Sequence, residues 1–93
     1  MSPEDLLAKV VDRDSFIAFV TALADERAEA ERMEREEPER YRFGGASNWQ
    51  NGDISAFLYS GLAYFTPKPF HTPEATPSWK MLAEFLYYGK IYE

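Results

Sequence analysis

The chain has 93 residues, a net charge of −6 and no cysteine, and 45% of its residues are hydrophobic. At this length folding buries between about 60 and 65% of the surface of the unfolded chain, so we expect one packed domain over residues 1–93. The lack of cysteine excludes a disulfide framework, a thiolate nucleophile and a cysteine metal site, and it favours a reducing compartment.

The acidic balance also limits the partners. With an isoelectric point near 4.7 the chain is poorly suited to nucleic acid, because that affinity depends mostly on Lys and Arg neutralising phosphates. The residues after Met1, Ser-Pro-Glu-Asp, contain neither a basic region nor a long apolar stretch, so we expect no signal peptide and no membrane span. We therefore expect a cytoplasmic protein with no nucleic-acid or membrane partner.

Two helices are predicted near the start of the chain. Ser2 is a typical N-cap with Pro3 at the first helical position, and Asp12 is the expected N-cap of a second helix. Val11 and Phe16 flank that second cap at the positions of an apolar staple, which fixes the angle between two helices. The apolar stripe of the second helix faces a core and consists of Phe16, Phe19, Val20 and Leu23.

The segment 25–37 consists almost entirely of strong helix formers and is highly charged, with Glu31 and Arg35 at i, i+4 spacing. We expect it to extend the second helix as a solvated arm that leaves the core and ends before Pro38. The alternative is that residues 25–42 form a docking surface for a partner. Whether the large apolar residues nearby reach the core decides between these interpretations: Met33, Tyr41 and Phe43.

A third helix is predicted after a loop. Gly44-Gly45-Ala46-Ser47 fits no phosphate-binding pattern, and Asp53 is placed to cap a helix that Pro67 closes. We expect Gly61 to let another helix approach closely. The predicted inner face of this helix comprises Ile54, Phe57, Leu58, Gly61, Leu62 and Phe65.

The fourth helix follows an extended crossover, residues 66–77, that contains four prolines and the only histidine, His71. A lone histidine lacks the converging ligands of a metal site and the partner that acid–base catalysis needs. Thr76 is the expected N-cap, with Pro77 at the first position and Gly89 as the C′ residue. The expected inward residues are Trp79, Leu82, Ala83 and Leu86, with Phe85 at their edge.

These elements predict an all-α fold, a compact four-helix globule with a charged helical extension after the second helix. The ordering also resembles a family of small bacterial single-domain proteins of unknown function with the pattern W-x-N, then P-S-W, then Y-E. The resemblance implies the same fold class and a bacterial source, and it implies no site. It is carried by Asp14-Ser15-Phe16-Ile17-Ala18-Phe19, Asn48-Trp49-Gln50-Asn51 with Ile54 and Phe57-Leu58, Pro77-Ser78-Trp79 with Ala83, and Tyr92-Glu93.

The two tryptophans, each near a predicted helix entry, have two interpretations. They close the ends of the core, with Asn51 and Ser78 satisfying backbone groups, or they line a small pocket where the two helix entries meet. The candidate pocket comprises Trp49, Asn51, Ser78 and Trp79. Ser78 has no paired base and is therefore no nucleophile.

Three function classes follow, and none requires a metal or a cofactor. A protein–protein interaction module, immunity-like or adaptor-like, would capture a basic partner through Glu34, Glu36 and Glu37 or through the aromatic residues Tyr59 and Tyr64. A homo-oligomeric structural protein would use the same tyrosines and the charged helix. A small-ligand protein or enzyme would use the tryptophan pocket. We do not expect an enzyme, because no carboxylate stands in a clearly apolar setting, Glu84 being the nearest case.

Overall fold

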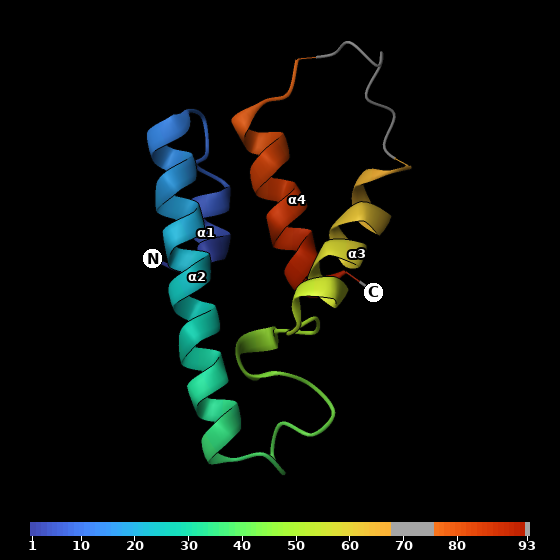
Figure 1. The fold of residues 1–93 in the computed structure, drawn as a ribbon. Coiled ribbons are helices and arrows are strands. Elements are labelled where there is room, and N and C mark those ends of the chain that lie inside the picture. The colour runs from blue at the N-terminus through green and yellow to red at the C-terminus, as the bar shows by residue number, and fades with distance from the viewer. Residues whose placement is uncertain (68–75, 93) are drawn as a thin grey trace.

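The chain folds into four α-helices and one short 3₁₀ turn in a computed structural model that describes residues 1–67 and 76–92 (Figure 1). The helices are α1 (Pro3–Leu7), α2 (Arg13–Glu36), α3 (Ile54–Phe65) and α4 (Trp79–Ile91), and the 3₁₀ turn is η1 (Ala46–Asn48). The predicted all-α fold with four helices is confirmed. Residues 68–75, which include His71 and most of the predicted crossover, lie outside the described residues.

Side-chain caps start all four helices. The Ser2 hydroxyl, the Asp12 carboxylate and the Asp53 carboxylate accept hydrogen bonds from the backbone N–H three residues on, as predicted. The cap of α4 was predicted wrongly at Thr76. Ser78 takes that place instead, with its Oγ 3.0 Å from the Met81 amide nitrogen, because a serine followed by a free amide at the third helical position completes the same cap two residues later.

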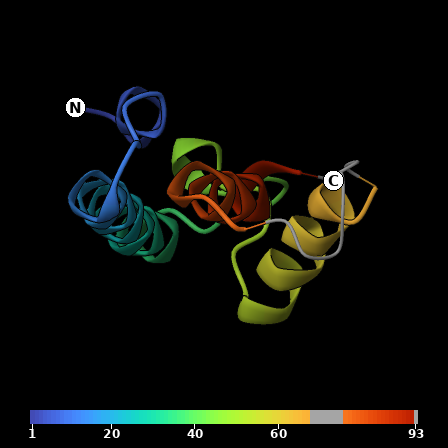
Figure 2. The same cartoon turned by 90° about the horizontal axis from the view of Figure 1, so that it is seen from above.

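The helices form a thin body of 46 × 27 × 16 Å in which α4 lies between α2 and α3 and packs against both (Figures 1 and 2). Helix α1 packs against α2 and α4 from the side turned away from the viewer of Figure 1, as the view in Figure 2 shows. Domains usually consist of two packed layers. Within residues 1–67 and 76–92, what backs the layer α2–α4–α3 is small: the five-residue α1 and the short turn η1.

The core follows α2. Phe19 and Leu23 of the predicted stripe are buried, and Phe16 and Val20 pack against them. The predicted staple is wrong, because Val11 is exposed whereas its neighbour Val10 is buried. The Ser15 hydroxyl accepts a hydrogen bond from the Val11 amide, at 2.9 Å, so the cap holds this stretch of backbone on the outside. On α4 Ala83 is buried, but the predicted inward residues Trp79 and Leu82 are exposed.

Two glycines mark the crossing of α3 and α4. A Cβ on Gly61 would lie 3.1 Å from the carbonyl oxygen of Phe85, and a Cβ on Gly89 would lie 3.0 Å from that of Phe57. The close approach predicted for Gly61 is confirmed. The C′ assignment of Gly89 is wrong, because Gly89 lies inside α4 and the helix continues to Ile91. Close packing, rather than a left-handed turn, accounts for glycine at this position.

The charged extension is part of α2, which runs without a break to Glu36, just before Pro38 as predicted. The expectation that it leaves the core is wrong. The loop after α2 turns back along the helix, so Ala30 is fully buried and Met33 and Tyr41 pack on the core, whereas Phe43 is exposed. None of the helices in the described ranges 1–67 and 76–92 is both long enough and apolar enough to cross a membrane.

Candidate functional site

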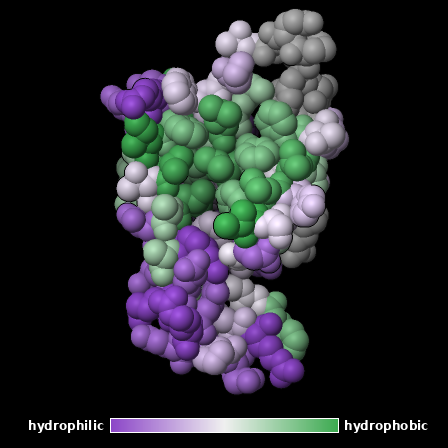
Figure 3. Space-filling view, viewed as in Figure 1, coloured by the Kyte–Doolittle hydropathy of each residue, from purple (hydrophilic) through white to green (hydrophobic). Residues whose placement is uncertain are grey.

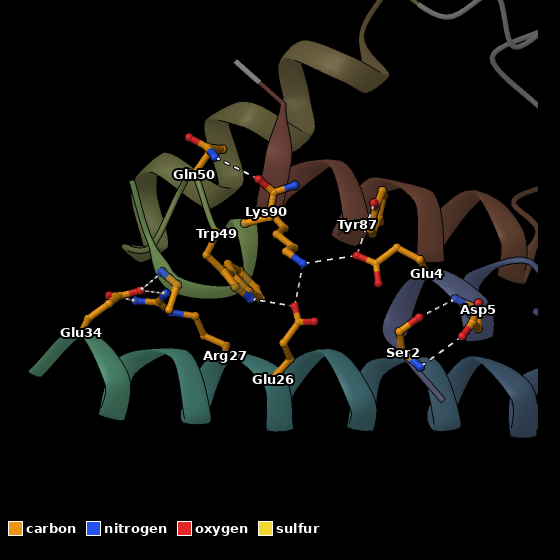
Figure 4. Close-up of polar contacts among 12 residues, drawn as sticks. Ser2, Glu4, Asp5, Glu26, Arg27, Glu34, Trp49, Gln50, Tyr87 and Lys90 are labelled. Carbon is orange, nitrogen blue, oxygen red and sulfur yellow. Dashed lines mark hydrogen bonds and ion pairs between the residues drawn. The ribbon is translucent and has the colours of Figure 1, made fainter. Parts of the chain in front are cut away.

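A buried lysine joins three parts of the fold at the C-terminal end of α4. Lys90 is only 1% exposed, and its ammonium lies 2.6 Å from the Glu26 carboxylate of α2 and 3.4 Å from the Glu4 carboxylate of α1 (Figure 4). The indole nitrogen of Trp49 donates to the same Glu26 oxygen at 2.9 Å. A buried charge is costly unless it is paired and hydrogen-bonded, and here both conditions are met.

Glu4 is the outer member of this group. Partial burial raises the pKa of its carboxyl, but a backbone hydrogen bond and the Lys90 ammonium together lower it by more. The pKa of Glu4 is therefore below its ordinary value. Glu4 also lies 3.5 Å from the Tyr87 hydroxyl, whose pKa is raised, mainly by burial. The lysine therefore holds α1 against α4 through a carboxylate that remains ionised.

Trp49 lies between two cations. The Lys90 ammonium is 5.6 Å from the centre of its ring and the Arg27 guanidinium carbon is 5.3 Å from it, both within the range of cation–π attraction. Arg27 in turn donates two hydrogen bonds to the Glu34 carboxylate, at 3.1 and 3.3 Å. That carboxylate also accepts a hydrogen bond from the backbone amide of Ala46, at 3.0 Å. This chain of contacts fixes the loop after α2 against the helix (Figure 4).

Asn51 closes the same end of the molecule. Its side-chain amide donates to the carbonyl oxygens of Gly89 and Tyr92, at 3.1 and 2.9 Å, and its backbone N–H donates to Lys90 at 3.2 Å. Carbonyls in the last turn of a helix have no partner within the helix. Asn51 thus satisfies backbone groups as predicted, but at the end of α4 rather than at a helix entry.

The four residues of the candidate tryptophan pocket are not brought together. Trp49 and Asn51 contact the C-terminal end of α4, whereas Ser78 and Trp79 begin that helix, and Trp79 packs on Phe16 with ring centres 5.3 Å apart. The cause is the direction of the helices. Because α3 and α4 run antiparallel, the entry of α3 lies beside the exit of α4 (Figure 1).

The candidate partner surface is also divided. Glu34 faces inward, while Glu36 pairs with Arg32 at 2.8 Å and Glu37 with Arg40 at 3.3 Å. Tyr64 stacks on Tyr88 with ring centres 3.8 Å apart, and burial is the main cause that raises the pKa of its hydroxyl. Tyr59 is exposed, on a different helix from the three acids. The acids are therefore matched by arginines of the same chain.

A groove that we did not predict begins at Trp49 and Asn51, two residues of the candidate pocket, and extends along α2 and α3. It has a volume of about 460 Å³. Helices α2 and α3 form its two walls, and α4, which lies between them, forms its floor. Its apolar lining is Val20, Leu23 and Ala24 from α2, Phe57, Ile54 and Leu58 from α3, Leu86 from α4, and Trp49, which directly follows η1. We call this feature, with these residues, the apolar groove. Figure 3 shows apolar surface gathered on this face and polar surface over the charged extension.

Among the residues that the structure describes, the charged ones that line the apolar groove lie at one end of it. They are Arg27, Glu31 and Asp53. Arg27 is paired with both Glu31 and Glu34, and the pKa of Asp53 is lowered chiefly by the hydrogen bond that its carboxylate accepts from the Ala56 amide. The rest of the lining offers side chains without charge, so the groove is suited to apolar contact rather than to acid–base chemistry.

The apolar row on α3 is the sequence signal for the groove, but its spacing led to the wrong prediction that the row is buried. Ile54, Leu58 and Leu62 follow one another at i, i+4 and i+8 and were predicted to face the core, but all three are exposed. Of the predicted inner face, Phe57, Gly61 and Phe65 do lie against α4, and Tyr64 joins them by stacking on Tyr88. Nothing in the local sequence singled out Lys90. Glu84 is half-buried, and within residues 1–67 and 76–92 no three His, Cys, Asp or Glu side chains are arranged to hold a metal ion.

Comparisons of the chain with family models, with curated proteins and with solved structures found no match.

Proposed function

We propose that this protein is a protein–protein interaction module that holds its partner in the apolar groove. The supporting observation is the exposure of a whole apolar ridge on α3, where Ile54 is 81% and Leu58 46% exposed beside a groove of about 460 Å³. Single exposed hydrophobic residues are ordinary on monomeric proteins. A contiguous exposed ridge beside an apolar groove is typical of a binding surface.

The charged half of the molecule is less suited to this role. The three candidate acids are engaged by arginines and a backbone amide of the same chain, so a basic partner would have to displace Arg32 from Glu36 or Arg40 from Glu37. The exposed ion pairs that a basic partner would form in exchange would each contribute only about 0–1 kcal/mol to binding. In the apolar groove, by contrast, the hydrophobic contribution to the binding free energy is about 25 cal/mol for each Å² of apolar surface that a partner covers.

Site-specific photocrosslinking in the native cell tests the proposal. A photoreactive phenylalanine analogue replaces Leu58 in the groove or, as the matched control, Ala18. Both positions are exposed, but residue 18 lies two positions before Val20 and is therefore turned by about 200° away from the groove side of α2.

We expect an adduct of defined mass from position 58 and none from position 18. Equal labelling from both positions, or none from either, contradicts the proposed function. The mass of the adduct also separates two kinds of partner, since a second copy of this chain adds 10.7 kDa and another protein adds a different mass.

A further inference from the structure

The exposed apolar surface extends beyond the lining of the groove. Residues three, four, seven or eight positions apart share one face of a helix. By that spacing Ile17 continues the α2 wall from Val20 and Ala24, Leu62 continues the α3 ridge from Ile54 and Leu58, and Trp79 and Leu82 continue the α4 row from Leu86. All four of these added residues are exposed: Ile17, Leu62, Trp79 and Leu82.

We infer that the occupant of this groove is a second copy of the same chain, so that the protein is a two-fold symmetric dimer. The inference rests on the proposed function, because it uses the same surface. In the dimer the α3 ridge of each copy, Ile54, Leu58 and Leu62, lies in the apolar groove of the other. The layer α2–α4–α3 then receives a second layer on its open face, opposite the face on which α1 lies.

Shape supports a second copy. A two-fold interface uses the same patch on both partners, so the patch must contain both a projection and a recess that accepts it. Here the two are adjacent, because Ile54 and Leu58 belong to the exposed ridge and also form one wall of the groove. An apolar partner helix would fill the recess but would leave the outer side of the ridge uncovered.

The area is also sufficient. The three ridge residues with Ile17, Trp79 and Leu82 leave on the order of 500 Å² uncovered, which is in the upper range for the largest apolar patch on a monomer. Two such patches meeting would bury on the order of 1,000 Å² from these residues alone, which is the lower limit expected of a biological interface, and the groove lining adds to it. The net charge of −6 does not prevent this contact, because the patch itself consists of uncharged side chains.

Charge instead sets the expected salt dependence. Two copies that both carry −6 repel each other at long range, and salt screens that repulsion. We therefore expect the dimer to tighten as salt rises from about 20 to 300 mM, where the Debye length shortens by severalfold. A complex with a basic partner would weaken over the same range.

The first experiment measures the mass of the purified full chain by light scattering and sedimentation at several concentrations. We expect twice the chain mass of 10.7 kDa at high concentration. Ile54→Ser should raise the dissociation constant at least tenfold, since the lost contact occurs twice in the dimer, and Leu58→Asp should give a monomer. Ala18→Asp is the control and should leave the dimer intact. Because Ile54 is mostly exposed, Ile54→Ser remains informative if Leu58→Asp does not fold.

A second experiment uses the absence of natural cysteine. Leu58 is the middle residue of the ridge, so the two-fold axis passes beside it, and Leu58→Cys should oxidise to a covalent dimer whereas Ala18→Cys should not. A wild-type monomer at all concentrations, or a dimer that ignores both groove variants, overturns this inference. If that monomer still gives an adduct with another protein from position 58, the proposed function stands and only the second copy is excluded. If it gives none, both fail.

Discussion

The two halves of this molecule place charge and apolar surface in opposite ways. At the loop end, a lysine and a tryptophan are buried among carboxylates and an arginine: Glu26, Arg27, Trp49 and Lys90. On the open face, isoleucine and leucine side chains of α3 stand in solvent: Ile54, Leu58 and Leu62. In the first half the charged groups of Lys90 and Arg27 are paired with carboxylates of the same chain, whereas in the second half apolar side chains are left uncovered. The difference is consistent with the proposal that the charged half stabilises the fold and the open half is the binding surface.

Removing the buried lysine is the strongest way to break this comparison. Lys90→Met leaves the Glu26 carboxylate without its ammonium partner, and breaking a buried ion pair from one side costs about 3–5 kcal/mol of unfolding free energy. The measurement is urea unfolding followed by circular dichroism. The double variant Glu26→Gln with Lys90→Met should recover part of that loss, because no unpaired charge remains. A loss below about 1 kcal/mol for the single variant would show that the charged half does not hold the fold.

The crossing of α3 and α4 connects the two halves, and Gly89→Ala tests it. The added methyl group would lie 3.0 Å from the Phe57 carbonyl oxygen, which belongs to the backbone and cannot move aside. Overpacking costs about 1–3 kcal/mol and the better helix propensity of alanine returns up to about 1 kcal/mol, so we expect a net loss near 1–2 kcal/mol. Gly44→Ala is the matched control, since a Cβ there meets nothing within 4 Å. Equal unfolding midpoints for the two variants would contradict the close packing at Gly89.

Acid should weaken the charged contacts gradually. The pKa values of Glu4, Asp12 and Asp53 are lowered in the folded chain, so each carboxylate stabilises the fold at pH values above its ordinary pKa. That contribution is lost as the pH falls through the lowered values, and we expect the melting temperature to drop between about pH 5 and pH 3. Glu4→Gln should flatten the drop slightly. A melting temperature that rises with acid over this range would show that these carboxylates oppose folding.

The smallest effect is expected at the exposed ridge. Ile54→Ser removes a side chain that is mostly in solvent, so the unfolding free energy of the isolated chain should change by no more than about 0.5 kcal/mol. The measurement is urea unfolding at concentrations too low for self-association. A loss of 2 kcal/mol or more would mean that Ile54 belongs to the core, and the contrast between the two halves would disappear.

Local signals in the sequence were sufficient for much of the fold. Three of the four N-caps and the end of α2 before Pro38 were predicted correctly, because a cap or a proline acts on residues within one helical turn. The apolar periodicity also located the buried residues Phe19, Leu23 and Ala83. These features are properties of single segments.

The errors concern contacts between segments. Gly89 carries the local signal of a helix end, but the closeness of Phe57, 32 residues earlier in the chain, determines its place. Lys90 carries no signal, because its two carboxylates come from α1 and α2. The prediction that the ridge of α3 is buried is wrong, because periodicity identifies an apolar face and does not say whether the same chain covers it. The four residues of the candidate pocket lie apart for a similar reason. Whether α3 and α4 run parallel or antiparallel cannot be predicted from the sequence of either helix alone.

The positions of the two tryptophans give each half of the molecule its own optical signal. Trp49 is 5% exposed and lies between two cations, whereas Trp79 is 39% exposed at the start of α4, beside the apolar face. Emission from a Trp79→Phe variant would come from the charged half alone, and emission from a Trp49→Phe variant from the open half alone. Burial of the exposed start of α4 therefore becomes visible through Trp79, and the inner end of the apolar groove, which Trp49 also lines, through Trp49, without any dye attached to the chain.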